Sequence, residues 1–440
     1  MTPPDAGRPP RLGVHVCTRD GAERMAVLLG DLAVVLDGFD AKVIVYDDST
    51  TSRHRASCRD ACSFAELDTQ YFGEPDRRAL VARAGSTMEL EADLLGASRP
   101  FGSGGWDLAG CRFTAMLNAA MHPDPATLHL FVDDDLRLVD ADYANRPYTI
   151  DTEGVRGLLG GSGLPTERLF AAGAGFRGRA DLALLEHLDA ALRDSWRVEK
   201  LGDDGRLSAC ISSGEDHHPD SPGISGGFLL TNRRSLRAVP LSPSYNEDWI
   251  WLRQLTMAGG TITRAGSAVL HAGSPRVALS LGVLRRQFEG EVLDTSVRLC
   301  AAAALPFDVA ATYVHEAFGV CVRKVDATLV RARALGTRSV CDLLRRFRAE
   351  VDRVPPAHFA DLLVRQADRS RRWARAFAAL TELEADDRLA ARSPHRVEPF
   401  LHEPVDDAHE VRRRRAAQTV GGVGLHRARP PAPGMLDRAP

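Results

Sequence analysis

Near its start, this 440-residue chain carries a strand, a helix and a second strand in succession. Residues 12–16 (LGVHV) and 41–46 (AKVIVY) are short apolar runs rich in β-branched residues, which predicts strands. Residues 21–36 between them carry apolar side chains at helical spacing. A strand, helix and strand in this order imply two parallel strands joined by a crossover helix. We therefore expect an α/β fold with a mostly parallel, Rossmann-like central sheet flanked by helices.

The rest of the chain continues this pattern and then becomes helical. Further strands are expected at 128–132 and 261–270, and helices at 111–121, 181–196 and 250–257. Residues 201–225 are polar and rich in Gly and Pro, which predicts a mobile loop. The expected organisation is a flexible leader (1–11), an α/β domain (12–275), a helical C-terminal region (276–390) and a disordered tail (391–440).

Charge and hydropathy exclude some classes of protein. A net charge of −3 gives no electrostatic footprint for nucleic-acid binding. No apolar run reaches the roughly 18 residues that a membrane-spanning helix needs, and the polar, Pro-rich start does not resemble a signal peptide. We therefore expect a cytoplasmic protein with no transmembrane segment and no nucleic-acid partner. Its heavy use of Ala, Arg, Gly and Asp is typical of a bacterial source.

The most informative motif is LFVDDD, residues 130–135. Asp133 and Asp135 are two residues apart, directly after a buried strand, where a sheet delivers side chains to a crevice. Carboxylate oxygens suit Mg²⁺ or Mn²⁺, and such a metal can stabilise a diphosphate leaving group. The alternative interpretation is an acidic turn that caps the next helix.

Three further motifs are weaker when each is taken alone. Asp47 and Asp48 end an early strand, where carboxylates often accept hydrogen bonds from a ribose. Glu247 and Asp248 stand beside Trp249, which suits an acid/base pair next to an apolar platform for a sugar ring. His271 follows the last expected strand and could bind a metal. Helix capping, or a structural histidine, explains each of them equally simply.

In this order, the motifs resemble those of the nucleotide-sugar glycosyltransferases of the GT-A fold, most closely those of glycosyltransferase family 2. The resemblance spans residues 12–271. It includes the polar loop after the first strand, the acidic end of the second, a basic helix before the aspartate motif, a Gly-Gly segment, the Glu-Asp pair and the final histidine. The residues at these places are Thr18 and Arg19, Asp47 and Asp48, Arg112 and Asn118, Asp133 to Asp135, Gly226 and Gly227, Glu247 and Asp248, and His271.

The resemblance implies a hexosyltransferase that uses a nucleotide sugar, with UDP-sugars favoured, and a divalent metal (Mn²⁺ or Mg²⁺). Asp248 would be the general base of an inverting transfer, and Glu247 would orient it or bind the acceptor. Gly226, Gly227 and Trp249 would bind an acceptor that the sequence does not identify. The metal would be held by Asp133, Asp135 and His271. The donor would be bound by Thr18, Arg19, Asp47, Asp48, Arg112, Asp133 and Asp134.

Other functions stay open from the sequence. A phosphohydrolase with Asp133 as nucleophile is disfavoured, because Arg137 stands where that pattern has Thr or Val. A nucleotidyltransferase is disfavoured by the absence of its Gly-rich loop from CTRDGAER. A non-catalytic nucleotide-sugar-binding protein remains an alternative.

The Arg-rich stretch 331–380, with twelve Arg and five acidic residues, is interpreted as a solvated helical face in preference to a site for an anionic partner. A homo-oligomer formed through these C-terminal helices is a further expectation.

Overall fold

The computed structural model describes residues 10–91, 108–139, 150–161, 164–178, 198–199, 208–209, 224, 226–241, 244, 246–271, 280–336 and 338–391. The predicted helix at 181–196 lies outside these residues, as do nearly all of the leader and the tail and most of the loop at 201–225. Residues Met1–Leu383 form one compact unit, which is described below. In the second unit, Glu384–Pro440, the structure describes only the end of the last helix.

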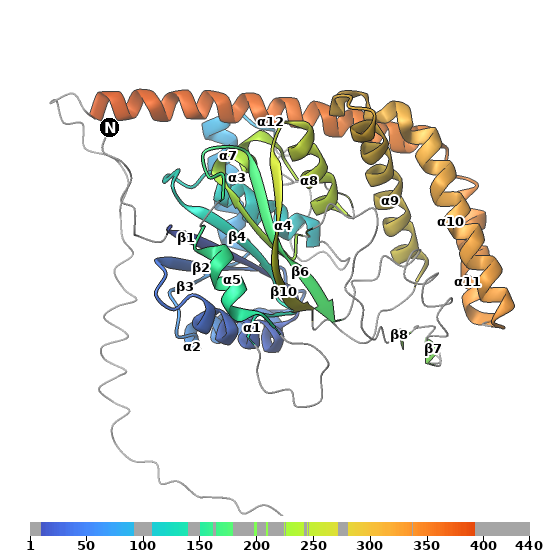
Figure 1. Cartoon of the computed structure of the whole chain (residues 1–440), viewed down its shortest axis with the longest axis horizontal. Coiled ribbons are helices and arrows are strands. Elements are labelled where there is room, and N and C mark those ends of the chain that lie inside the picture. The colour runs from blue at the N-terminus through green and yellow to red at the C-terminus, as the bar shows by residue number, and fades with distance from the viewer. Residues whose placement is uncertain are drawn as a thin grey trace, which may run out of the picture. The chain divides into compact units, whose positions relative to one another are not determined.

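The described strands form an eight-stranded mixed sheet in the order β3-β2-β1-β4-β9-β6-β10-β5 (Figure 1). Neighbours are parallel from β3 through β4 and between β6 and β10, whereas β9 and β5 run antiparallel to the strands beside them. A separate two-stranded sheet pairs β7 with β8. The strands are β1 (Leu12–Thr18), β2 (Ala41–Asp47), β3 (Thr69–Phe72), β4 (Leu128–Asp133), β5 (Leu136–Arg137), β6 (Phe170–Gly178), β7 (Val198–Glu199), β8 (Ser208–Ala209), β9 (Phe228–Asn232) and β10 (Thr261–His271).

Helices cover both faces of the sheet and also form the C-terminal region. They are α1 (Ala22–Val35), α2 (Ser52–Phe64), α3 (Glu74–Met88), α4 (Leu108–Ala120), α5 (Thr152–Leu159), α7 (Arg233–Ala238), α8 (Glu247–Met257), α9 (Leu281–Ala302), the 3₁₀ helix η1 (Phe307–Tyr313), α10 (Val314–Ala334), α11 (Arg338–Val351) and α12 (Pro356–Ala391). The α/β class predicted from the sequence is confirmed, and so is the helical C-terminal region.

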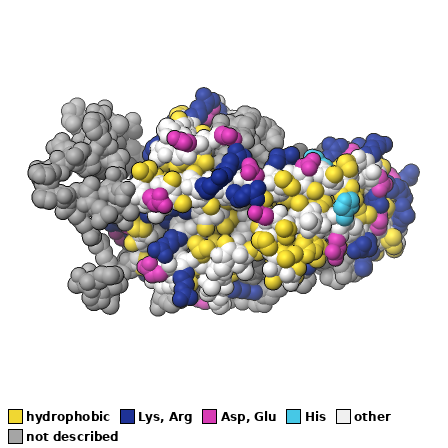
Figure 2. Space-filling view, turned by 90° about the horizontal axis from the view of Figure 1, so that it is seen from above, with side chains coloured by type: hydrophobic (Ala, Val, Ile, Leu, Met, Phe, Trp, Pro, Cys, Tyr) yellow, Lys and Arg dark blue, Asp and Glu magenta, His cyan; other side chains and the backbone are white. Residues whose placement is uncertain are grey.

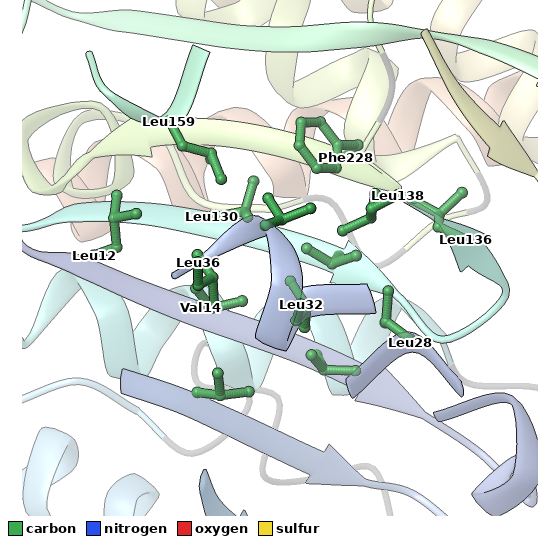
Figure 3. Packing of buried hydrophobic residues seen from close by; sticks show 14 of the residues in the cluster. Leu12, Val14, Leu28, Leu32, Leu36, Leu130, Leu136, Leu138, Leu159 and Phe228 are labelled. Atoms are coloured by element: carbon green, nitrogen blue, oxygen red, sulfur yellow. The ribbon is translucent and has the colours of Figure 1, made fainter. Parts of the chain in front are cut away.

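Alternation along the strands divides the apolar side chains between two cores. Val14 and Leu130 point to the face covered by α1, α2 and α5, where they pack with Leu28 and Leu32 (Figure 3). Residues of α3, α4, α7 and α8 build the core on the opposite face. Because side chains of a strand alternate between the faces, a helix on each face buries a strand completely. This explains why β1 and β4 consist almost entirely of buried residues.

A third core lies among α9, α10, α11 and the start of α12. The long helix α12 joins this core to the sheet. Phe359 packs in the helical core, whereas Trp373 and Phe377 pack in the core of the sheet. Trp373 Nε1 also donates a hydrogen bond to Leu236 O of α7 at 3.1 Å. The helical region and the sheet are therefore packed as one unit.

Within the described ranges, no single helix is long and apolar enough to cross a membrane, and α9 with the segment from η1 to α10 passes that test only as a pair bent by 115°.

Candidate active site

Polar residues end three neighbouring strands of the sheet. Thr18 ends β1, Asp47 ends β2 and Asp133 ends β4. Strand β1 is parallel to both neighbours, with Thr18 opposite Asp47 and Cys17 opposite Asp133. The carboxyl ends of parallel strands meet at one edge, so these side chains gather there. This is the crevice position that the sequence predicted for the aspartate motif.

Arg112 connects this edge to helix α8. Its buried guanidinium donates from Nη2 to both oxygens of Asp133 at 2.8 Å and from Nη1 to Glu247 Oε1. Burial would lower the pKa of Arg112, but Asp133, Glu247 and Asp248 raise it well above its usual value. Arg112 is therefore a permanent cation between the aspartate motif and the Glu-Asp pair. The sequence predicted it as a donor-binding residue, and here its terminal nitrogens contact carboxylates.

The middle aspartate of the motif points toward the first loop. Thr18 Oγ1 donates to Asp134 Oδ2 at 2.6 Å, and Arg24 Nη2 of α1 lies 3.2 Å from the same oxygen. Gly21 is needed here, because a Cβ atom at this position would lie 2.1 Å from Asp134 Oδ2. Burial raises the pKa of Asp134 to about 6, although Arg24 and Thr18 oppose the shift. Thr18 and Asp134, both predicted to bind the donor, thus bind each other and fix the loop between β1 and α1.

The third aspartate meets the predicted histidine. Strand β5 pairs His271 with Leu136, the residue after Asp135, and His271 Nε2 lies 3.1 Å from Asp135 Oδ2. Burial opposes ionisation of Asp135, but the hydrogen bond and charge of His271 lower its pKa overall. The other oxygen, Oδ1, is buried and has no hydrogen-bond partner among the described residues.

These two residues suit a divalent metal. A carboxylate with an unpartnered buried oxygen beside an imidazole nitrogen offers two ligands, and Mg²⁺ is commonly bound by one or two carboxylates plus substrate phosphates. Asp133 is engaged by Arg112 instead. Within the part of the chain that the structure describes, no group of three or more His, Cys, Asp or Glu side chains is arranged to enclose a metal. The geometry therefore fits a metal whose remaining ligands come from a substrate.

The acidic end of β2 is buried rather than open. Asp47 is completely buried, with Oδ1 accepting from Ser49 N at 2.8 Å and Oδ2 from Tyr71 Oη at 2.7 Å. Asp48 Oδ2 lies 3.4 Å from Arg19 Nη1, which joins the loops after β1 and β2. Each oxygen of Asp47 therefore already accepts one hydrogen bond within the protein.

Helix α8 begins at the predicted Glu-Asp pair. Glu247 is buried against Arg112, whereas Asp248 is half-buried and accepts a hydrogen bond from Gly226 N on Oδ2 at 2.6 Å. Burial and the neighbouring Asp248 raise the pKa of Glu247, although Arg112 opposes the shift. A Cβ atom on Gly226 would lie 2.6 Å from Asp248 Cβ, so only glycine permits this approach. Next to it, Gly227 O accepts a hydrogen bond from Asp133 N at 3.0 Å.

Trp249 is half-buried in the first turn of α8, beside Asp248. Two residues that shape the site, Arg24 and Tyr71, were not predicted from the sequence. Tyr71 lies on β3, and the β-branched and aromatic residues of Thr69–Phe72 are a signal that could have revealed this short strand. Arg24 has no such local signal, because its role depends on contacts that form only in the fold.

No protein-family model matches the chain, and no curated protein matches it by sequence. Several solved structures are similar to it. Glucosyl-3-phosphoglycerate synthase from Mycobacterium tuberculosis, in complex with Mn²⁺ and UDP, is 14% identical, with 68% of this chain and 81% of that chain covered and a TM-score of 0.35. Mannosyl-3-phosphoglycerate synthase from Rubrobacter xylanophilus is 12% identical, with 67% and 76% covered and a TM-score of 0.37.

The mannosyltransferase PcManGT from Pyrobaculum calidifontis, in complex with GDP-Man and Mn²⁺, is 14% identical to this chain. The similarity covers 83% of this chain and 88% of PcManGT, with a TM-score of 0.38.

Proposed function

We propose that this chain transfers a hexose from a nucleotide diphosphate sugar to an acceptor hydroxyl, with a divalent metal on the diphosphate and inversion at the anomeric carbon. One observation carries the proposal: Arg112 holds Asp133, at the end of β4, next to Glu247, at the start of α8. The aspartates at the end of β4, which suit a metal-bound diphosphate, and the acid/base pair at the start of α8 therefore belong to one site.

On the donor side, Asp135 and His271 would hold the metal, because Asp135 Oδ1 is buried and accepts no hydrogen bond from the residues that the structure describes. A divalent metal bound there would neutralise the diphosphate as it leaves. Asp133 and Arg112 are assigned to the donor side as a pair, since both carboxylate oxygens contact the guanidinium. The loops that carry Thr18 and Asp48 would form the wall beside the nucleoside.

On the acceptor side, Asp248 is assigned as the general base. The Gly226 N–H fixes Oδ2, and Oδ1 accepts no hydrogen bond from any described residue. The acceptor proton moves to this carboxylate as the acceptor oxygen bonds to the anomeric carbon. The bond from that carbon to the diphosphate oxygen breaks, and the nucleoside diphosphate leaves. Glu247, held by Arg112, orients the first turn of α8.

The proposal is tested by incubating the protein with UDP-glucose, UDP-galactose and GDP-mannose, each with Mn²⁺ or with EDTA, and with simple sugars as acceptors. Mass spectrometry identifies the products. We expect Mn²⁺-dependent release of a nucleoside diphosphate from one donor, together with a rise in Tm caused by binding to the native state. Release of pyrophosphate from a nucleoside triphosphate would indicate a nucleotidyltransferase instead. Donor binding without any product would indicate a non-catalytic binding protein.

A further inference from the structure

Helix α8 lies between two of the hydrophobic cores. Trp251, Leu252 and Leu255 pack in the core of the sheet, whereas Ile250 packs in the helical core with residues of α9. The helix that begins with Glu247 and Asp248 is thus shared by the sheet and the C-terminal helices. Its position depends on both.

The side of α8 that faces α9 carries a polar contact at each end. Ile250 and Arg253 are spaced by three residues, which places them on one face of the helix, and Asn246 directly precedes it. On α9, Glu291 and Asp294 are spaced by three and also share a face. Asn246 Nδ2 donates to Glu291 Oε1 at 3.4 Å, and Arg253 Nε donates to Asp294 Oδ1 at 2.7 Å. We call these five residues the α8–α9 seam.

The two carboxylates of the seam are buried, and Arg253 and Lys324 balance their charges. Glu291 and Asp294 are both buried, and Lys324 of α10 lies 3.4 Å from Glu291 Oε2. Arg253 makes a second contact with Asp294, from Nη2 to Oδ2 at 3.2 Å. Removing a buried, paired carboxylate is costly, because it leaves the charged partner buried without a counter-charge. We therefore expect these pairs to hold α8 in place against α9.

Asn246 gives the seam a link to the backbone that starts α8. Its φ is 59°, in the left-handed region that few residues other than glycine adopt. Such backbone persists where the surroundings determine it, and it clusters at functional sites. The contact with Glu291 is made by the residue directly before the Glu-Asp pair, so a shift of α9 would move that pair.

We propose that Glu291 and Asp294 of α9 are positioning residues, which set the location of Glu247 and Asp248 through Asn246 and Arg253. This inference rests on the proposed function for its effect on catalysis. In this assignment, Glu291 and Asp294 act through their contacts with Asn246 and Arg253. The helical region would then be a support of the active site, since it holds one side of the helix that carries the base.

The test compares Glu291→Ala and Asp294→Ala with Glu350→Ala. Glu350 pairs with Arg285, also on α9, at the exposed surface, and is the matched control. We expect kcat for release of the nucleoside diphosphate, measured with the donor that those incubations select, to fall by about 10²-fold, as for a small misplacement of a catalytic group. KM for the donor and the affinity for UDP with Mn²⁺ should change little. Glu291→Gln, which can still accept from Asn246, should restore most of the rate.

Hydrogen exchange gives a second readout that needs no activity. Amides in the first turn of α8 should exchange faster in Glu291→Ala and in Asn246→Gly, which keeps the left-handed backbone and removes the amide contact. Unchanged exchange in both variants, or an equal loss of kcat in Glu350→Ala, would overturn the inference. A wild-type protein without turnover overturns the proposed function alone, because the exchange result still decides whether the seam holds α8.

Discussion

Nη2 of Arg112 lies 2.8 Å from each carboxylate oxygen of Asp133, while Nη1 of the same guanidinium contacts Glu247. A single buried cation thus joins a strand end to the first residue of a helix that follows it by more than a hundred positions. Two carboxylates share one positive charge, so the balance of charge at this edge is sensitive to any change of Arg112.

Replacing Arg112 by Met should therefore destabilise the protein. Asp133 and Glu247 would lose their common partner, and breaking a buried ion pair typically costs about 3–5 kcal/mol. The free energy of unfolding from urea titration measures the effect. Arg285→Met, which removes an exposed partner of Glu350, is the control and should change stability little. Equal losses of unfolding free energy in the two variants would show that the ion pairs of Arg112 contribute no more to stability than an exposed pair does.

Asp135→Ala should abolish metal-dependent binding of UDP without unfolding the protein. The variant removes the unpartnered Oδ1 and the contact with His271, so a diphosphate would lack its metal in a partly buried crevice. Calorimetric titration of UDP with and without Mn²⁺ measures this. Asp124→Ala, which removes a carboxylate paired with Arg11 before β4, should titrate like the wild type. Identical titrations for Asp135→Ala and wild type would exclude Asp135 as a ligand.

Gly226→Ala should reduce turnover more than it reduces the affinity for UDP. The added Cβ would lie 2.6 Å from Asp248 Cβ and 3.0 Å from Arg112 Nη1, so the start of α8 has to move. Gly30→Ala is the control, because nothing lies within 4 Å of a Cβ at this helical position. That substitution should raise stability by about 0.5–1 kcal/mol. Normal turnover in Gly226→Ala would show that the close approach is dispensable.

Much of the fold follows from local periodicity. The strands and helices predicted around residues 12–47, 111–132 and 250–270 are confirmed because their apolar spacing matches their burial. Residues 52–88 were not divided into elements, and they form α2, β3 and α3. Strand β3 has only four residues, too few to show a period.

The site was less predictable than the fold, because its contacts join distant residues. The sequence shows three adjacent aspartates, but only the fold directs Asp133 to Arg112, Asp134 to Thr18 and Asp135 to His271. The roles assigned to these residues remain proposals.

Surface ion pairs along the Arg-rich stretch 331–380 support its interpretation as a solvated helical face. Arg348 pairs with Asp326 and Asp352, and Arg371 pairs with Asp308. Figure 2 shows basic and acidic side chains intermingled on the face seen from above, rather than one basic field. An oligomer formed through these helices stays a prediction.

His15 should make stability depend on pH. It is buried between Tyr46 Oη (2.9 Å) and His129 Nδ1 (3.1 Å), and burial, with His122 nearby, lowers its pKa from 6.5 to about 3. Below pH 6.5 the unfolded chain binds a proton that the folded chain does not, so the free energy of unfolding falls as the pH falls. The loss should reach about 2 kcal/mol at about pH 5.

Urea unfolding at about pH 7.5 and about pH 5 measures this dependence. His15→Gln should weaken it, whereas His315→Gln, at an exposed position of α10, is the control for loss of an imidazole. A slope unchanged by His15→Gln would show that this residue does not contribute.

Asp248→Asn should lower turnover by about 10² to 10⁴-fold, the usual worth of general-base catalysis. Asparagine keeps the shape and can still accept the Gly226 N–H, but it cannot take the acceptor proton. Donor affinity should stay close to that of the wild type, because Asp135 and His271 are unchanged. Glu247→Gln should reduce turnover less if Glu247 only orients the helix through Arg112. Turnover and UDP binding of both variants decide the roles. If Glu247→Gln is inactive and Asp248→Asn is active, Glu247 is the base and Asp248 the orienting residue. If both variants are fully active, the two residues only begin helix α8 and have no catalytic role.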